Sequence, residues 1–188
     1  ADARWINTLR QVKDNDEIAL ISRAIGIAED AFRAIDIRDW IGLTEQDAAD
    51  ALQRAIADAG RRRGVRAVPS FDIIVAAGSH AAMPHHHPGA ARIGPRDILK
   101  IDWGARTAHY CSDMTRTFQL GRASRKFRDV YRTVLAANRA AIAAVTPGVA
   151  LKTIDRAARR IIEKAGYADN FGHGTGHGVG IDIHEGAP

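Results

Sequence analysis

The sequence predicts an α+β fold made of two related halves, each with two helices followed by strands, and with the second half incomplete. Two observations support this prediction. Helical periodicity gives way to strand-like segments at residue 70, returns after Gly121, and is lost again in a glycine-rich end. Both helical regions also close on the same dipeptide, Ala59-Gly60 and Ala165-Gly166. We expect residues 1–188 to form a single domain, with no separate N-terminal domain.

The first half begins with two predicted helices. Apolar side chains recur at helical spacing over residues 14–35, and Asp14 or Asp16 can cap the first helix. The second helix is predicted over residues 43–60, with Thr44 as its N-cap and a glycine at its end. Acidic residues in its first turn favour the positive end of the helix dipole: Glu45 and Asp47.

Strand-like segments and two more helices follow. Short apolar segments with β-branched residues predict strands over residues 70–78, 97–105 and 109–121, and the last two are joined by a short turn. Helical periodicity then predicts helices over residues 124–145 and 151–166. The order helix, helix, strands therefore begins a second time.

The composition indicates a globular, soluble protein, with 46% hydrophobic and 26% charged residues. The net charge is +5, and its one basic cluster, residues 61–66, is interpreted as a solvated turn, so no nucleic-acid partner is expected. No apolar segment is long enough to predict a membrane helix or a signal peptide. Cys111 is the only cysteine, which favours a reducing compartment, and we expect a cytoplasmic protein.

Two aspartates lie on predicted neighbouring strands. Asp102 is flanked by apolar residues in "ILKIDWG", where an unpaired carboxylate would be strongly destabilising. Asp113 lies on the strand that should return beside it. Two carboxylates held close together favour a bound cation, and a divalent metal is the natural partner. On spacing alone, ion pairs with Arg106 or Arg116 explain the aspartates equally well.

The glycine-rich end, "GHGTGHGVGIDIHEGAP", contains His173, His177 and His184. Its glycines disfavour a helix, so we expect an extended strand with His173 and His177 on the same face. A phosphate-binding loop is the competing interpretation, but no Gly-Lys-Ser/Thr sequence follows. Three histidines facing two strand aspartates favour a metal site.

A second group of histidines lies in "PHHHPG", which contains His85, His86 and His87. We interpret two of the three as incidental residues of a surface loop. The third is a candidate for proton transfer, because imidazole titrates near neutral pH and the loop leads into the strand that carries Asp102.

These segments resemble the Xaa-Pro aminopeptidase and prolidase branch of the M24 metallopeptidases, which have the pita-bread fold. The residues that carry the resemblance are "PHHHPGAARIGPRDILKIDWGARTAHYCSDMTRTFQLG" and "YADNFGHGTGHGVGIDIHE", and it extends from about Val12 to Pro188. The resemblance implies a catalytic-type domain of two ααββ halves that hydrolyses peptides with proline at the second position.

The resemblance also implies a centre of two divalent ions, often manganese, cobalt or zinc, held by five residues. Asp102, Asp113 and His177 match three of these ligands. Thr115 matches a threonine near the ligands. Other histidines match residues that contact the substrate or assist proton transfer: His85, His173 and His184.

The sequence departs from the family at its end. The two remaining ligands of the family are glutamates downstream of the position of His184, and Glu185 matches a residue that is not a ligand. We therefore expect weak metal binding, and little or no peptidase activity, from this chain. Missing strands would leave apolar sheet surface uncovered, which favours a homodimer. The alternatives are a non-catalytic binding module of the same fold and an enzyme similar to methionine aminopeptidase.

Overall fold

The computed structural model describes residues 4–186. The chain divides into two compact units. The first contains the described residues up to 122 together with residues 178–185, and the second contains residues 123–177 and Gly186. That residues 1–188 form one domain stays a prediction.

The first unit begins with helices whose ends are set by local hydrogen bonds. Helices α2 (Asn15–Arg33) and α3 (Glu45–Arg62) confirm the first two predicted helices. Asp14 and Thr44 are their N-caps, and each forms a capping box with the residue three positions later. Helix α1 (Arg4–Gln11) was not predicted.

The predicted end of the second helix at Gly60 is wrong. Helix α3 continues to Arg62, and the chain reverses at Gly64, which has a φ of 70°. Gly60 is buried within the helix, where a β-carbon would lie 2.7 Å from Cβ of Ala67. A close packing contact with the segment that leads into strand β1 (Val68–Pro69) therefore explains this glycine.

Six strands of the first unit form two antiparallel sheets. The larger sheet has the order β2-β3-β6, with β2 (Ile74–Ala77), β3 (Ile98–Trp103) and β6 (Met114–Gln119). The smaller has the order β1-β4-β5, with β4 (Ala105–Thr107) and β5 (Tyr110–Cys111). The three strand-like segments are confirmed, but each of the last two is divided between the two sheets.

The division at Gly104 has a steric cause. A β-carbon at this position would lie 1.8 Å from the carbonyl oxygen of Ser112, so the two segments cross too closely for any side chain. The turn between β4 and β5 is tight as well, because Ala108 and His109 have positive φ values of 47° and 71°.

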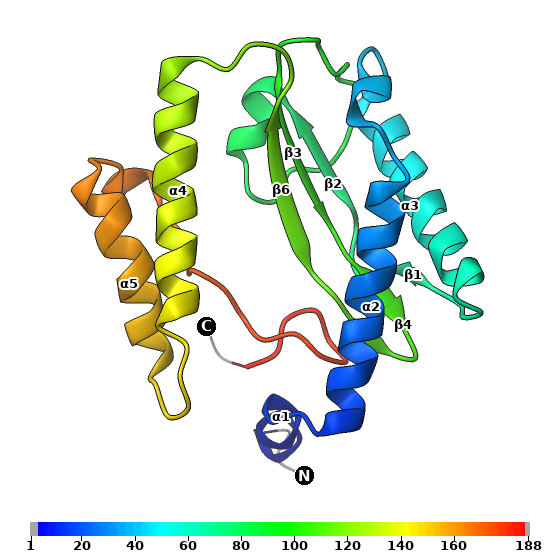
Figure 1. Ribbon diagram of the computed structural model, residues 1–188, viewed down its shortest axis with the longest axis vertical. Coiled ribbons are helices and arrows are strands. Elements are labelled where there is room, and N and C mark those ends of the chain that lie inside the picture. The colour runs from blue at the N-terminus through cyan, green and yellow to red at the C-terminus, as the bar shows by residue number, and fades with distance from the viewer. Residues whose placement is uncertain (1–3, 187–188) are drawn as a thin grey trace. The chain divides into compact units, whose positions relative to one another are not determined.

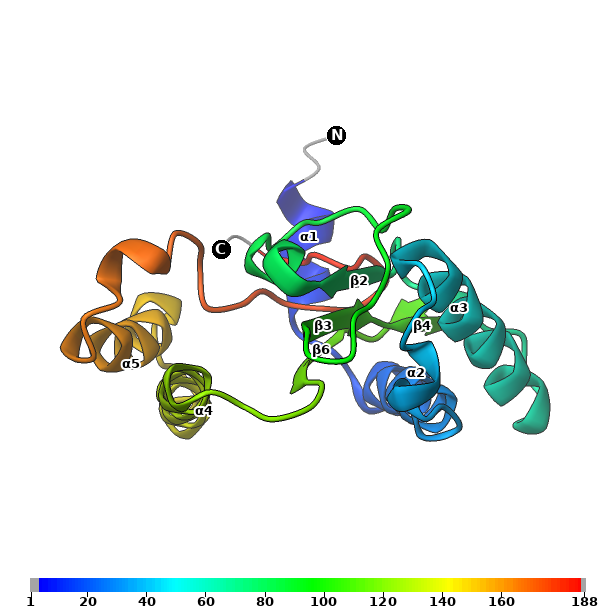
Figure 2. The same ribbon diagram turned by 90° about the horizontal axis from the view of Figure 1, so that it is seen from above.

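Helices α2 and α3 lie side by side against the sheets of the first unit (Figures 1 and 2). The core of this unit contains side chains from both helices and from the larger sheet: Ile27, Leu52, Val75, Ile101 and Trp103. The burial of β3 alternates, with Leu99, Ile101 and Trp103 in the core. Because successive side chains of a strand point to opposite faces, Lys100 and Asp102 share the other face of the sheet.

The second unit is built on an antiparallel pair of helices, α4 (Arg125–Ala143) and α5 (Leu151–Lys164), which confirms both predictions (Figure 1). The buried residues between the two helices are mostly alanines, whose small side chains let the helices pack closely: Ala137, Ala141 and Ala158, together with Ile162. Gly166, with a φ of 81°, follows the end of α5 as expected.

Three short 3-10 helices complete the described elements: η1 (Ile37–Trp40), η2 (Gly78–Ala82) and η3 (Ala168–Asn170). Among the helices of the described residues, none is both long and apolar enough to cross a membrane.

The predicted terminal strand is wrong. Residues 172–186 form a loop, and its only strand-like pairing is an isolated bridge between Gly178 and Glu185. Glycine loses more conformational entropy than any other residue in a strand. Among residues 4–186 the loop joins neither sheet, although the backbone N–H of Cys111 in β5 donates to the carbonyl oxygen of Gly180 at 2.7 Å. His173 and His177 therefore do not share the face of a strand.

Candidate metal centre and the histidine loop

The candidate metal centre begins with Asp102 on β3. Asp102 lies opposite Thr115 of β6, and Asp113 directly precedes β6, so the antiparallel pairing brings the two carboxylates together. Burial raises the pKa of the Asp102 carboxyl, and the neighbouring Asp113 carboxylate adds to this rise. A hydrogen bond with Thr115 and the charge of Lys100 oppose it.

One oxygen of this carboxylate has no partner. Oδ1 of Asp102 is buried and accepts no hydrogen bond from any of the described residues. Arg106 and Arg116 form no ion pair with Asp102 within residues 4–186, and Arg116 donates instead to the carbonyl oxygen of Thr115 at 2.8 Å. The interpretation that an arginine neutralises Asp102 is therefore wrong for this part of the chain.

A divalent cation would satisfy this arrangement. Buried carboxylate oxygens without partners are destabilising, and two adjacent carboxylates resist ionising together unless a cation neutralises them. Asp102 and Asp113 therefore fit the metal centre expected from the sequence, and both would be ligands.

Three histidines expected at or near this centre belong to the glycine-rich loop. His173 and His177 lie in the second unit and His184 in the first, and all three are exposed. Nδ1 of His173 lies 2.8 Å from the carbonyl oxygen of Gly174, and its ring meets Phe171 edge-on with centroids 4.9 Å apart. The convergence of His177 with Asp102 and Asp113 stays a prediction.

An ion pair that sequence reasoning missed holds the start of this loop within the second unit. Asp155 and Arg159 of α5 pair at 3.0 Å, and this arginine holds the pKa of the Asp155 carboxyl at about 2. Asp155 also accepts hydrogen bonds from the backbone and hydroxyl of Thr175, at 3.1 and 2.7 Å. Arg159 donates to the carbonyl oxygen of His173 at 3.0 Å.

The loop that carries His85 is anchored on one side by Lys100. The Lys100 ammonium donates to the carbonyl oxygens of Met83 and Pro84, the two residues before His85. Burial lowers the pKa of Lys100. Lys100 and Asp102 share one face of β3. The lysine that holds the loop of His85 therefore lies on the same face of the sheet as Asp102.

A buried glutamate anchors the other side of the loop. Glu45, the first residue of α3, is fully buried and accepts hydrogen bonds from Nδ1 of His80 at 2.9 Å and Nε2 of His86 at 2.8 Å. Backbone N–H groups of Ala77 and Gly89 donate to the same carboxylate at 2.8 and 3.3 Å. Burial by itself would raise the pKa of Glu45, but the hydrogen bonds from Ala77, His86 and His80 outweigh it and hold the pKa below its usual value.

This cluster corrects one interpretation of the sequence. Glu45 lies in the first turn of α3 as expected, with its side chain turned into the interior, and Asp47 forms the capping box. His86 was counted among incidental surface histidines, but its side chain is only 11% exposed and is bonded to Glu45. His80 was not singled out at all, because nothing in its local sequence distinguishes it.

Comparisons with known proteins agree with this geometry. The model of metallopeptidase family M24 matches residues 19–188. The chain belongs to metallopeptidase family M24.

Solved structures of peptidases resemble the chain over nearly its whole length. It is 38% identical to a dipeptidase from Pyrococcus horikoshii OT3, with a TM-score of 0.92, covering 99% of this chain and 51% of that one. An X-Pro aminopeptidase from Thermotoga maritima MSB8 is 34% identical, with a TM-score of 0.89 and coverages of 98% and 51%. The α+β pita-bread fold expected for this M24 chain is therefore confirmed.

Curated relatives agree as well. An uncharacterized peptidase from Staphylococcus aureus strain MSSA476 is 38% identical over 180 residues, which are 96% of this chain and 50% of the relative. The M24 chain thus spans about half the length of the relatives it matches.

Glu185 of this chain is a buried carboxylate that pairs with two basic side chains. Its side chain is 5% exposed and lies 2.9 Å from Nζ of Lys13, while Nε of Arg10 donates to it at 3.1 Å. Although burial opposes the shift, these two cations and the backbone N–H of Asp182 lower the pKa of Glu185 to about 2. Glu185 therefore ties helix α1 to the loop within the first unit.

This ion cluster predicts sensitivity to acid. Because the folded pKa of Glu185 lies below its unfolded value of about 4.5, its stabilising contribution is present above pH 4.5 and is lost as the pH falls toward 2. Glu185→Gln should remove about 2–3 kcal/mol of stability at pH 7 and flatten the dependence below pH 4.5. Urea unfolding between pH 7 and pH 3 measures both. Asp182→Asn is the control, since Asp182 also pairs with Arg10 but is 65% exposed; an equal loss would contradict the prediction.

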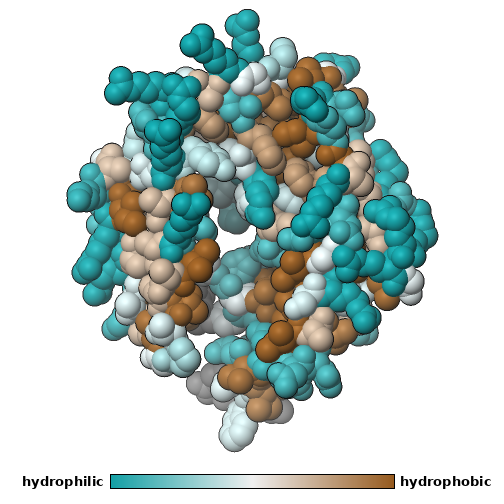
Figure 3. Space-filling view, viewed as in Figure 1, coloured by the Kyte–Doolittle hydropathy of each residue, from teal (hydrophilic) through white to brown (hydrophobic). Residues whose placement is uncertain are grey.

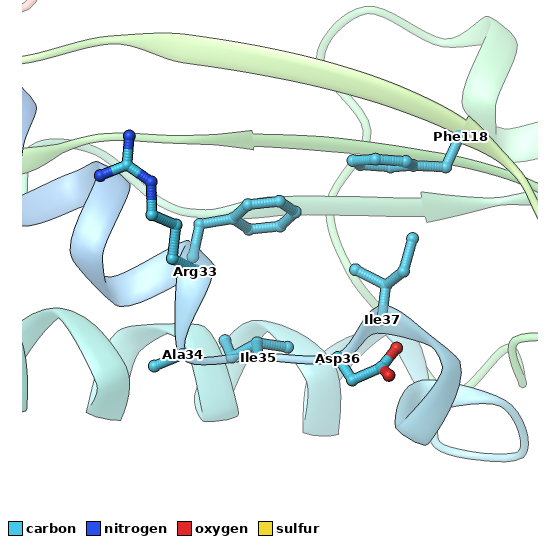
Figure 4. A pocket seen from close by; sticks show the side chains of 7 residues that line it. Arg33, Ala34, Ile35, Asp36, Ile37 and Phe118 are labelled. Atoms are coloured by element: carbon cyan, nitrogen blue, oxygen red, sulfur yellow. The ribbon is translucent and has the colours of Figure 1, made fainter.

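A shallow pocket of the first unit lies apart from these groups (Figure 4). It is lined by residues from the end of α2 to the start of η1 and by one residue of β6: Phe32, Arg33, Ala34, Ile35, Asp36, Ile37 and Phe118. Its charged groups already have partners, because Asp36 pairs with Arg38 and Arg33 with Glu29. The pocket therefore offers apolar surface and no convergent catalytic groups.

Proposed function

We propose that this M24 chain carries the catalytic site of a metal-dependent aminopeptidase or dipeptidase that releases the residue preceding proline. The carboxylate of Asp102, with its unpartnered buried oxygen beside Asp113, carries the proposal. The likeness to solved proteins described as an X-Pro aminopeptidase and a prolidase supports the substrate class. Residues 1–188 are proposed to act as one catalytic-type domain in the cytoplasm.

Asp102, Asp113 and His177 are proposed as ligands of two divalent ions, with manganese, cobalt or zinc as candidates. When bound, such ions polarise the scissile carbonyl and activate water near neutral pH. Carboxylate and imidazole donors suit all three metals. Proline as the second residue removes the amide hydrogen that ordinary peptide sites recognise, so a dedicated site is chemically reasonable.

His85, His173 and His184 are proposed to contact the substrate and to carry protons. All three side chains are exposed, as a group that meets a substrate must be before it binds. Lys100 and Glu45 hold the residues on either side of His85, and we propose that they fix the direction of its imidazole. Preorganisation of this kind lowers the entropy lost when a substrate is bound.

The 188-residue chain by itself should turn over peptides slowly. Two divalent ions carry four positive charges, and two aspartates with a hydroxide return only three, so the affinity for the ions should be low. The experiment compares this chain with a version extended to include the family's two glutamate ligands, both supplied with manganese and assayed on Ala-Pro and Ala-Ala peptides. We expect the extended version to cleave Ala-Pro at least 100-fold faster.

Each outcome of this assay has a distinct meaning. Asp113→Asn in the extended version is the control and should abolish turnover. Equal turnover by the two versions would contradict the role of the glutamates. Preference for Ala-Ala, with the metal dependence intact, would contradict the proline specificity and leave the peptidase proposal standing.

We also propose the homodimer expected from the sequence. Apolar side chains of α4 lie on the surface (Figure 3), among them Tyr131, Val134 and Ile142, with exposures of 45%, 52% and 64%. Exposed apolar side chains on one element are typical of association surfaces.

A further inference from the structure

We propose that Glu45, His80 and His86 form a separate binding site for a divalent transition-metal ion of the zinc type. The ligand atoms of these three residues all lie within 4.8 Å of one another. One carboxylate and two imidazoles are a donor set that zinc takes in proteins. The inference goes beyond the peptidase function, because none of the three residues belongs to the aspartate pair or its expected ligands.

The distances agree with this donor set. Two ligands about 2.1 Å from one ion, at roughly right angles to tetrahedral angles, lie roughly 3.0–3.4 Å apart. Nδ1 of His80 lies 2.9 Å from Oε1 of Glu45, and Nε2 of His86 lies 2.8 Å from Oε2. A small rotation of the two rings therefore brings both nitrogens onto one ion, and the His80 side chain, 36% exposed, gives the ion a path from solvent.

The surroundings hold these ligands in place. The backbone N–H groups of Ala77 and Gly89 fix the carboxylate of Glu45, as outer-shell hydrogen bonds do in metal sites. The rings of His80 and His86 are stacked, with centroids 4.4 Å apart and planes inclined by 29°, so the two imidazoles face the carboxylate from one side. The site is thus ordered before an ion arrives.

Binding requires each imidazole to present a lone pair at the nitrogen that now faces Glu45. A neutral imidazole does so by moving its proton to its other nitrogen, and an imidazolium does so by releasing a proton to solvent. The ion then replaces two N–H donors of the carboxylate, so no buried group loses a partner.

The site is distinct from the aspartate pair in place and in chemistry. Glu45 bonds to Ala77 of β2, whereas Asp102 pairs with Ile74, three residues along the same strand, which corresponds to about 10 Å. Ions of a dinuclear centre lie about 3.5–4 Å apart, so one centre cannot include both groups. Two imidazoles favour zinc over manganese, which prefers oxygen ligands.

An ion at this site would join the start of α3 to the loop that carries His85. His80 precedes that loop and His86 lies within it, next to His85, and both would be bound to Glu45 through the ion. Zinc should therefore slow the motion of residues 80–89 without entering the aspartate pair.

The test uses the full 188-residue chain with Asp102→Asn and Asp113→Asn, which remove two proposed metal ligands of the candidate peptidase centre. After chelator treatment, zinc titration by calorimetry should give one ion per chain. His80→Gln and His86→Gln, introduced singly, should each lower the zinc affinity at least tenfold. Amide hydrogen exchange of residues 80–89 should slow with zinc and stay unchanged with manganese.

The control is His87→Gln, since His87 is an exposed neighbour outside the cluster and should leave the affinity within twofold. Circular dichroism verifies that every variant is folded. Two results would overturn the proposal. If the doubly substituted chain binds no zinc, the three residues form a hydrogen-bonded cluster only. If His87→Gln weakens binding as much as His86→Gln does, the adjacent histidines of the loop bind zinc at the surface.

Discussion

Replacing Glu45 with alanine is expected to lower the free energy of unfolding by about 3–5 kcal/mol. The carboxylate is fully buried and accepts hydrogen bonds from two backbone N–H groups and two imidazoles. Alanine leaves the N–H groups of Ala77 and Gly89 without an acceptor and opens a polar cavity at the start of α3. Urea unfolding of the metal-free chain at pH 7 measures the loss.

The matched control is Asp47→Ala, two residues along the same helix. Asp47 is exposed and closes the capping box with Thr44, so its removal should lower the stability by only about 0.5–1 kcal/mol. Similar losses for the two variants would mean that the Glu45 cluster adds nothing beyond helix capping. Glu45→Gln should lie between them, because the amide oxygen still accepts hydrogen bonds but carries no charge.

Asp102→Asn is expected to raise the stability of the metal-free chain and to remove the stability that bound metal adds. In a chelator at pH 7 the variant should be more stable than the parent, by on the order of 1 kcal/mol after screening by solvent, because asparagine removes a half-buried charge beside Asp113. With manganese present, the parent should gain stability as the ion concentration rises, and the variant should gain almost none.

The stability difference between Asp102→Asn and the parent should grow as the pH rises. The folded pKa of Asp102 lies above its unfolded value of about 3.8, so its charge destabilises the folded chain increasingly as the pH rises through and above that value. The difference between Asp102→Asn and the parent should therefore be large at pH 7 and small near pH 3.5, which urea midpoints at the two values will measure. The exposed Asp72→Asn should show no such difference. If Asp102→Asn is less stable than the parent at pH 7 in chelator, the proposal that the Asp102 carboxylate is destabilising without a bound cation is contradicted.

Local patterns in the sequence were sufficient for several parts of this protein. The helices that became α2, α3, α4 and α5 were predictable, because helical periodicity and caps such as Asp14 and Thr44 act over three or four residues. The closeness of Asp102 and Asp113 was also predictable, since Asp113 directly precedes the strand that pairs with the one carrying Asp102.

Contacts between distant segments were not predictable in this way. The groups that bond to Glu45 lie 32 to 44 residues further along the chain, and only the packing of α3 against β2 brings them to its carboxylate. Gly60 and Gly104 were similarly ambiguous, because a glycine required by a close crossing has the same sequence as one that ends a helix or a strand.

The sequence by itself therefore determined the helices, the family resemblance and the aspartates on neighbouring strands, all of which depend on residues near one another in the chain. Only the tertiary structure decided that Asp102 keeps a buried oxygen without a partner, that Glu45 gathers His80 and His86, and that residues 172–186 form a loop. Burial and hydrogen bonding at these positions depend on which distant segments pack together, and the local pattern of side chains does not encode that choice.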